Sequence, residues 1–423
     1  MRDVFAAVIL AALLAAMAPA GAAERAIEVL GYLGRYDPAT IAVWPERLQV
    51  LMGGADQEGR KVAEARARAK AAGNPARFFF YLSFSSLDGG CGCWESDVLG
   101  RLRREHPEFL LTDAREARVS TFLDVLPRER QLAADIGNPG YVDWWADVTL
   151  EEVARHGWDG VFADNVIRGS FDDGSWSAVP INRRTGRPYT TTEYRTDMLA
   201  AVSRLRARYD AAGKLVIGNH SSAWRSFAED PVLRKQATAL HGVELEDFVY
   251  TFGGKPQPEA DWLRQLRYLD FANTQGVLTW AVGGKGALME PAKREYVLAS
   301  YLLTRRGRSV VGELNALHTW WPALGRDLGA PRGGFYCLDP GADFARTERC
   351  DAPGRVFMRD FERARAVVNP GDAVRRVPLR GEALAGVDGE AVADPLELGP
   401  HAGRLLLRSD HTASLTSSGR VDR

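Results

Sequence analysis

The 423-residue sequence contains little cysteine, little histidine and almost no net charge. Its seven histidines are scattered and form no HExxH or HxH pair, which disfavours a metallohydrolase site, so no metal or other cofactor is expected. A net charge of −1, with arginines mixed among acidic residues, argues against a nucleic-acid partner, which needs a concentrated basic face. The sequence also lacks a GxSxG motif and a phosphate-binding P-loop, so neither a serine-hydrolase elbow nor nucleotide binding is supported.

Long apolar runs are absent except at the start of the chain. Residues 4–18 are apolar and are followed by small residues up to Ala23, which is the pattern of a signal peptide over residues 1–23 cleaved near Ala22 or Ala23. The alternative is a membrane anchor, but about 15 apolar residues fall short of the roughly 20 that span a bilayer. We therefore expect a secreted or periplasmic protein with no membrane contact after cleavage.

Four cysteines follow this segment, and an even number in an exported chain predicts disulfides because the compartment is oxidising. Cys337 and Cys350 flank a loop that contains glycine, aspartate and proline, and they form the predicted pair. Three states stay open for Cys91 and Cys93: a very small disulfide ring, free thiols, or ligation of a metal together with distant residues.

The rest of the chain has an ordinary globular composition, with 46% apolar and 26% charged residues. Short β-rich runs alternate with longer helical ones, a pattern typical of parallel α/β folds. Eight strands are predicted at residues 47–52, 77–84, 131–136, 160–165, 214–219, 240–246, 277–282 and 309–314. We therefore predict a (β/α)8 TIM barrel as the catalytic domain over residues 24–328.

The composition changes after Trp320 and Trp321. Short β-runs then alternate with glycine and proline, which predicts a small C-terminal antiparallel β domain over residues 329–409. Residues 410–423 are polar and are expected to form a flexible tail.

One predicted strand, 160–165, ends abruptly in a carboxylate, Asp164. Gly160, Phe162 and Asp164 share one face of this strand, whereas Val161 points to the other. Active sites of α/β barrels lie at the C-terminal ends of the strands, so an aspartate in this place favours a catalytic role. The competing interpretation is that Asp164 caps the next helix or pairs with an arginine.

The best partner for Asp164 lies two predicted strands later. Strand alternation places Glu244 and Glu246 on one face, about 6.6 Å apart along the strand. Two carboxyl groups across a cleft are what glycosidic cleavage requires, one ionised and one protonated. We expect Asp164 to be the nucleophile and Glu246 the acid/base, with Glu244 as the competing acid or a substrate-binding group. A solvated acidic loop is the alternative.

Other polar and aromatic residues near strand ends are candidates for binding sugar hydroxyls or for stacking on a sugar ring. Asp135 has an equally good interpretation as a helix cap, His220 as a hydrogen-bonded structural histidine, and the tryptophans as core residues. The substrate-binding candidates are Asp135, Asn165, Asn219, His220, Glu244, Trp280 and Trp94.

Several segments together resemble a known family of proteins. Residues 157–166 read GWDGVFADNV and are similar to the DGVFLDN strand of TIM-barrel glycosidases related to the alpha-galactosidase clan. The other matching segments are 106–113 (HPEFLLTD), 135–139 (DIGNP), 218–219 (GN) and 246–248 (EDF). In this order, over roughly residues 47–369, the chain resembles the putative glycosyl-hydrolase-like family 15, which is distinct from the glucoamylases.

The resemblance implies a (β/α)8 barrel with a C-terminal β domain. It also implies a nucleophilic aspartate at the end of strand four and an acid/base carboxylate at the end of strand six, which correspond to Asp164 and Glu246. The segment around Glu246 is more acidic than the usual pattern of the family. The leading hypothesis is an exported retaining glycoside hydrolase acting on a polysaccharide or oligosaccharide. The alternatives are a catalytically silent carbohydrate-binding barrel and a metal-dependent hydrolase.

Overall fold

The computed structural model describes most of the chain between residues 30 and 408. The described residues are 30–32, 48–54, 59–123, 126–127, 130–166, 171, 174–284, 290–307, 309–313, 321–347 and 349–408. The expected signal peptide (1–23), Trp320 and the expected tail (410–423) lie outside them. Within the described part, no helix combines the length and the apolar character needed to cross a bilayer.

The chain divides into two compact units. The first consists of the described residues of Glu28–Val297 and Ser309–Thr319. The second consists of the described residues of Leu298–Arg308 and Trp320–Arg423.

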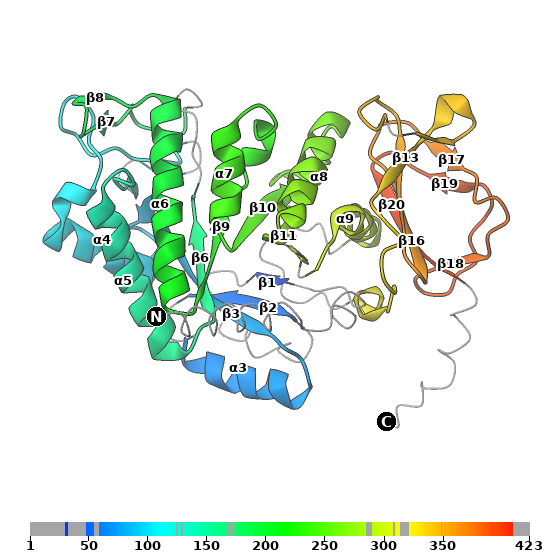
Figure 1. The fold of residues 1–423 in the computed structure, drawn as a ribbon, viewed down its shortest axis with the longest axis horizontal. Coiled ribbons are helices and arrows are strands. Elements are labelled where there is room, and N and C mark those ends of the chain that lie inside the picture. Colours follow the sequence, from blue (N-terminus) through cyan, green and yellow to red (C-terminus); the bar gives the residue numbers. More distant parts are fainter. Residues whose placement is uncertain are drawn as a thin grey trace, which may run out of the picture. The chain divides into compact units, whose positions relative to one another are not determined.

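The first unit is built around an eight-stranded parallel sheet (Figure 1). In sheet order its strands are β1 (Leu30–Tyr32), β2 (Val50–Gly53), β3 (Arg77–Ser83), β6 (Gly160–Asp164), β9 (Leu215–Asn219), β10 (Gly242–Phe248), β11 (Leu278–Gly283) and β12 (Val310–Glu313). The first and last strands adjoin, since a Cβ on Gly312 of β12 would lie 2.9 Å from the carbonyl oxygen of Leu30. The sheet is therefore wound into a barrel, and the predicted TIM-barrel fold is confirmed.

One predicted barrel strand is wrong, and one barrel strand was missed. Residues 131–136 form no barrel strand; β5 (Gln131–Ala133) pairs antiparallel with β4 (Ser86–Asp88) in a separate two-stranded sheet. The first barrel strand is instead β1, which the sequence did not predict. A strand of three residues carries too little periodicity to be recognised, and a short apolar run does not reveal which sheet it joins.

Helices surround the barrel strands (Figure 1). Those of the first unit, with α9 continuing into the second, are α3 (Gly59–Ala71), α4 (Trp94–Glu105), α5 (Pro139–His156), α6 (Thr191–Ala211), α7 (Pro231–Ala239), α8 (Glu259–Thr274) and α9 (Pro291–Thr304). Several begin with a cap: Asn138 accepts from the Gly140 amide ahead of α5, and Thr190 forms a capping box with Glu193 ahead of α6. Short 3-10 turns lie at η1 (Pro107–Phe109) and η2 (Ala223–Arg225), and a small hairpin is formed by β7 (Ile181–Asn182) and β8 (Arg187–Pro188).

The interior of the barrel is filled by apolar side chains from alternate positions of the strands. Phe162 stacks on Trp280 with ring centroids 5.4 Å apart, and Phe79 meets Trp280 edge-on at 5.1 Å. The core cluster is Leu30, Val50, Met52, Phe79, Phe162, Ile217, Trp280, Val282 and Val310. Because side chains two residues further along each strand share this face, Tyr81, Asp164 and Asn219 follow the packed layer toward the C-terminal ends of the strands.

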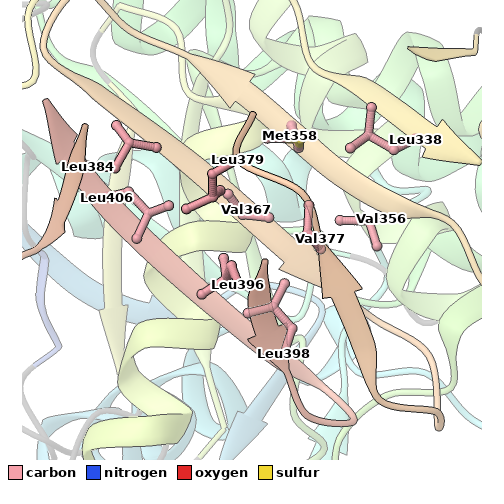
Figure 2. Close-up of a cluster of buried hydrophobic side chains, with 10 residues drawn as sticks. All are labelled: Leu338, Val356, Met358, Val367, Val377, Leu379, Leu384, Leu396, Leu398 and Leu406. Atoms are coloured by element: carbon pink, nitrogen blue, oxygen red, sulfur yellow. The ribbon is translucent and has the colours of Figure 1, made fainter. Parts of the chain in front are cut away.

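The second unit contains a six-stranded antiparallel sheet. Its order is β14 (Ala345–Thr347), β13 (Tyr336–Asp339), β15 (Val356–Asp360), β16 (Ala364–Asn369), β20 (Ala402–Arg408) and β18 (Leu384–Gly386). A second pair, β17 (Arg375–Val377) and β19 (Leu396–Leu398), lies over a shared apolar cluster (Figure 2). Between the first two strands lies the 3-10 turn η4 (Pro340–Ala342), and η3 (Pro322–Gly325) precedes the sheet. The predicted antiparallel β region at the C-terminus is confirmed.

Both cysteine pairs are disulfides. The predicted Cys337–Cys350 bond is present, with a sequence separation of 13, and Cys91 is bonded to Cys93. Of the three states open for the second pair, the structure therefore shows the small ring. Within the described residues no group of three or more histidine, cysteine or acidic side chains is arranged to hold a metal ion.

Removing the longer disulfide is expected to destabilise the second unit. The Cys337→Ser/Cys350→Ser double variant should lose about 3 kcal/mol of unfolding free energy, because the bond restricts the unfolded chain over this loop. Denaturant unfolding monitored by circular dichroism measures the loss. The matched control is Cys91→Ser/Cys93→Ser, which opens a far smaller ring and should lose less; equal losses would contradict the loop-closure explanation.

Candidate active site

Asp164 lies at the C-terminal end of β6, half-buried, and its carboxylate is held by three donors. The Tyr81 hydroxyl donates to Oδ2 at 2.5 Å, while the Asn219 side-chain amide and the Asn165 backbone N–H donate to Oδ1 at 2.8 and 2.7 Å. Three donors on two oxygens leave the carboxyl group little freedom to rotate. The group is thus fixed in orientation.

The backbone around Asp164 explains why the strand ends there. Gly160 begins β6 in very close contact with the next strand, because a Cβ on it would lie 2.1 Å from the Leu215 carbonyl oxygen. Asn165 has a left-handed backbone with φ of 57°, a conformation that asparagine tolerates better than most residues. Its carbonyl accepts from the Ser85 hydroxyl at 2.5 Å. This turn directs the Asn165 N–H at the Asp164 carboxylate.

A continuous chain of hydrogen bonds joins Asp164 to the backbone of Glu246. The Asn219 amide donates to Asp164, and the Asn219 Oδ1 accepts from the Ser221 hydroxyl at 2.5 Å. The Ser221 Oγ in turn accepts from the Glu246 N–H at 2.7 Å. Three neighbouring strand ends, those of β6, β9 and β10, are therefore tied together at the two residues predicted to be catalytic.

Glu244 lies on the same strand as Glu246 and is completely buried, with 0% of its surface exposed. Among the described residues neither of its carboxyl oxygens has a hydrogen-bond partner. Burial, and then the charges of Glu246, Asp164 and Asp247, raise the pKa of Glu244 well above its ordinary value. The structure therefore gathers Glu244, Glu246 and Asp164 in one electrostatic cluster.

Asp247 is a further member of this cluster that sequence alternation missed. The pairing of β10 with β11 shifts register between Leu245 and Phe248, and Asp247 has a left-handed φ of 57°. The side-chain amides of Gln257 and Gln265 both donate to its carbonyl, at 3.1 and 3.0 Å. Such a bulge redirects side chains, so strict alternation fails beyond Glu246. Burial raises the pKa of Asp247 to about 7, and Arg225 opposes the shift.

Tyr81 was also missed, although the sequence contained a signal for it. It lies two residues beyond the core residue Phe79 on β3 and therefore faces the barrel interior near the strand end. A hydroxyl at that place could have been predicted to meet a carboxylate of a neighbouring strand. In the structure β3 pairs with β6, with Ser83 opposite Asp164.

Four of the predicted substrate-binding residues do not join this cluster, and His220 is the first. Its ring is fully buried, with Nδ1 bonded to the Tyr268 hydroxyl and Nε2 3.3 Å from the Gln236 side-chain oxygen. Burial lowers the pKa of His220 to about 3, so the ring is neutral. His220 thus faces helices α7 and α8 as a structural histidine, because it follows Asn219 on the opposite face of the chain.

The rings of Trp280 and Trp94 do not face the carboxyl cluster of Asp164, Glu244 and Glu246. Trp280 is 1% exposed and stacked within the barrel core, which corrects the expectation of a substrate platform. Trp94 packs against Phe80 with ring centroids 5.0 Å apart, and Phe80 also contacts Trp158. Since Phe80 alternates with the inward-facing Phe79 and Tyr81, Trp94 lies on the outer side of β3.

Asp135 belongs to a different polar group. It is 4% exposed and lies 4.0 Å from the Arg183 Nε, and burial raises its pKa while Arg183 opposes the shift. The cap of α5 is provided by Asn138 and not by Asp135. Among the described contacts, none connects Asp135 with Asp164.

Comparison with known proteins gives a matching family and similar folds. A family model described as "Hypothetical glycosyl hydrolase family 15" matches residues 86–365. No curated protein sequence gives a match. Among solved structures, a noncanonic maltogenic alpha-amylase, AmyB from Thermotoga neapolitana, is similar with a TM-score of 0.51 at 11% identity, covering 90% of this chain and 98% of the amylase. The alpha-galactosidase AgaA from Geobacillus stearothermophilus gives a TM-score of 0.45 at 13% identity, covering 89% of this chain and 51% of its own.

Proposed function

Because the chain belongs to the hypothetical glycosyl hydrolase family 15, whose model matches residues 86–365, we propose that it is a retaining glycoside hydrolase acting on a polysaccharide or oligosaccharide. Asp164 is the nucleophile and Glu246 the acid/base. The observation that carries this proposal is the hydrogen-bonded chain from Asp164 through Asn219 and Ser221 to the Glu246 backbone. It fixes two carboxyl-bearing strand ends relative to each other at the face of the barrel where chemistry occurs.

Asp164 has the environment that a nucleophile needs. Its three hydrogen-bond donors hold it in one orientation, so little reorganisation precedes attack. Phe162 and Trp280 close the barrel beneath it, which leaves the C-terminal side as its approach for a sugar. An isolated helix cap would not need this set of donors.

Glu246 has the complementary position. Its backbone N–H is anchored by Ser221, and its side chain is half-buried at the end of β10, whereas Glu244 on the same face is fully buried. An acid catalyst must lie where the leaving oxygen can reach its carboxyl group, which a half-buried place at a strand end allows. Of the two glutamates, Glu246 is therefore the one able to reach a leaving sugar.

The reaction then follows the double displacement of retaining enzymes. The Asp164 carboxylate attacks the anomeric carbon while Glu246 gives its proton to the glycosidic oxygen; the bond to the leaving sugar breaks and a glycosyl ester of Asp164 forms. Water then gives a proton to Glu246, and its oxygen attacks the same carbon and releases Asp164. The two inversions restore the original anomeric configuration.

We further propose that the protein acts outside the cytoplasm, in a secreted or periplasmic form. Two disulfides, Cys91–Cys93 and Cys337–Cys350, support this location because such bonds persist in oxidising compartments. The apolar start of the sequence is consistent with export.

A screen with direct observation of the product tests the function. The probes are 4-nitrophenyl α- and β-glycosides of glucose, galactose and mannose, together with defined polysaccharides. Proton NMR during turnover should show the first product anomer with the configuration of the substrate. Initial release of the opposite anomer would contradict the retaining mechanism. Binding of a polysaccharide without any turnover would favour the silent carbohydrate-binding barrel.

Loss of the Tyr81 hydroxyl is expected to slow turnover. Tyr81→Phe removes one of the donors that orient Asp164, and a misaligned nucleophile reduces kcat by about 10- to 100-fold. Steady-state kinetics on the substrate found in the screen measures the effect. Tyr189→Phe is the matched control, because its hydroxyl bonds Asp197 instead, at 2.8 Å. Wild-type kcat in Tyr81→Phe would show that this bond is dispensable.

A further inference from the structure

The Cys91–Cys93 disulfide takes no part in the hydrolysis proposed above. It closes a ring through a single residue, since the two cysteines are only two positions apart in the sequence. Gly92 between them has a left-handed φ of 63°, which glycine adopts at no steric cost. Because the stabilisation by a disulfide grows with the length of the loop that it closes, so small a ring contributes little to the stability of the fold.

This disulfide is reachable from solvent. Both of its cysteines are partly exposed, and Gly89, Gly90 and Gly92 around them are exposed. A Cβ on Gly92 would meet no atom within 4 Å other than those of its chain neighbours. In the other disulfide, Cys337 is fully buried on β13, which pairs with β14 on one side and β15 on the other. An exposed disulfide exchanges with external thiols more readily than a buried one, because the attacking thiolate must reach a sulfur atom.

Two polar groups lie where they can stabilise a negative charge on the Cys91 sulfur. The Cys93 N–H donates to the Cys91 Sγ at 3.3 Å, and the Ser96 Oγ lies 3.1 Å from the same sulfur. The Ser96 Oγ also lies 3.2 Å from the Asp88 carbonyl oxygen, so its hydroxyl can turn from that acceptor to the sulfur. Hydrogen bonds to the charged form stabilise a thiolate, which makes Cys91 the better leaving group of the two.

We propose that Cys91–Cys93 is a thiol–disulfide exchange site whose reaction partner is an external dithiol. A thiolate of the dithiol attacks the Cys93 Sγ; the S–S bond breaks, and its electron pair leaves with the Cys91 Sγ, which takes a proton from water. The second thiolate of the dithiol then attacks the dithiol's own sulfur in the mixed disulfide and displaces the Cys93 thiolate, which is protonated in turn. The protein gains two electrons and two protons, and the dithiol becomes a cyclic disulfide that can reverse the same steps.

Mass mapping after brief reduction tests the exchange site. The native protein is treated with dithiothreitol, quenched with iodoacetamide and digested under non-reducing conditions. Cys91 and Cys93 should be alkylated at least about tenfold faster than Cys337 and Cys350, which serve as the internal control. Equal rates, or a Cys91–Cys93 bond that survives until the protein is unfolded, would overturn the proposal. No sugar takes part, so the result is independent of the proposed hydrolase activity.

Reduced glutathione, a monothiol, identifies the sulfur that is attacked. Since it has no second thiol, its mixed disulfide should accumulate on Cys93 while Cys91 is alkylated; glutathione on Cys91 would contradict the assignment. Ser96→Ala removes the hydroxyl beside Cys91 and should slow this reaction by about two- to tenfold. Ser203→Ala is the matched control, because the Ser203 hydroxyl donates to the Leu199 carbonyl on α6 instead. An unchanged rate in Ser96→Ala would refute stabilisation of the Cys91 thiolate by this hydroxyl.

Discussion

Asp164→Asn is expected to lower kcat by at least about 10⁴-fold, because the amide cannot form the glycosyl ester through which the reaction proceeds. Asparagine has nearly the same shape and can still meet Tyr81 and Asn219 after reorientation of its amide. Binding of the substrate or of a product sugar should therefore persist. Steady-state kinetics gives the loss of turnover, and isothermal titration calorimetry gives the retained affinity.

The matched control for Asp164→Asn is Asp159→Asn, at the opposite end of β6. Asp159 precedes β6, and its carboxylate accepts from Arg66 and from the Phe78 N–H, both at 2.8 Å. Asp159→Asn should reduce stability but not kcat, since the residue lies at the N-terminal side of the strand. Full activity of Asp164→Asn, or an equal loss in Asp159→Asn, would contradict the assigned role.

Glu246→Gln is expected to separate substrates by their leaving groups. Hydrolysis of the natural glycosidic bond should fall by about 10²- to 10⁴-fold, because the departing sugar oxygen needs a proton. A 2,4-dinitrophenyl glycoside of the same sugar departs as a stable anion, so its ester with Asp164 should still form rapidly. Burst kinetics of dinitrophenol release measures this first step.

An exposed glutamate provides the control for Glu246→Gln. Glu229 lies between η2 and α7, exposed to solvent, and Glu229→Gln should change neither substrate's kinetics. Equal losses on both substrates in Glu246→Gln would exclude acid catalysis by this residue. Loss confined to the natural substrate in a Glu244 variant would transfer the role to Glu244.

The barrel was predictable because most of its strands are continuous apolar runs followed by polar residues. Val161, Phe162 and Ala163 predict a buried strand, and alternation along it correctly places Phe162 inside the barrel, in the cluster with Trp280. The same alternation puts Glu244 on the inward face of β10, where the structure finds it near Asp164. Local periodicity was therefore sufficient to predict the barrel and to predict that these carboxyl groups lie near one another.

Features that depend on the pairing of strands far apart in the sequence could not be predicted from local periodicity. Leu30–Tyr32 is a barrel strand because it pairs with β2. Gln131–Ala133 lies outside the barrel because it pairs with β4 instead. The register shift in β10 that brings Asp247 into the cluster is likewise a property of the pairing with β11. Each depends on a partner far along the chain, which periodicity does not report.

The roles of side chains at the strand ends could not be predicted from the sequence either, because they depend on which distant residues each side chain contacts. His220 and Asn219 are adjacent in sequence, yet Asn219 bonds Asp164 whereas His220 bonds Tyr268 behind the barrel wall. The sequence alone is equally compatible with Trp280 as a core residue and as a stacking platform for a sugar; its stacking on Phe162 identifies it as a core residue. Residue type alone does not distinguish a binding group from a packing group.

The most direct test of a covalent role for Asp164 is mass spectrometry of the protein after treatment with 2,4-dinitrophenyl 2-deoxy-2-fluoro-glycosides of glucose, galactose and mannose. These probes form the glycosyl ester but hydrolyse it slowly, because the fluorine destabilises the transition state. The account predicts that one probe adds a single fluoro-sugar to Asp164, and that Asp164→Asn stays unlabelled. A label on another carboxylate, or none in a protein that hydrolyses the parent glycoside, would contradict it.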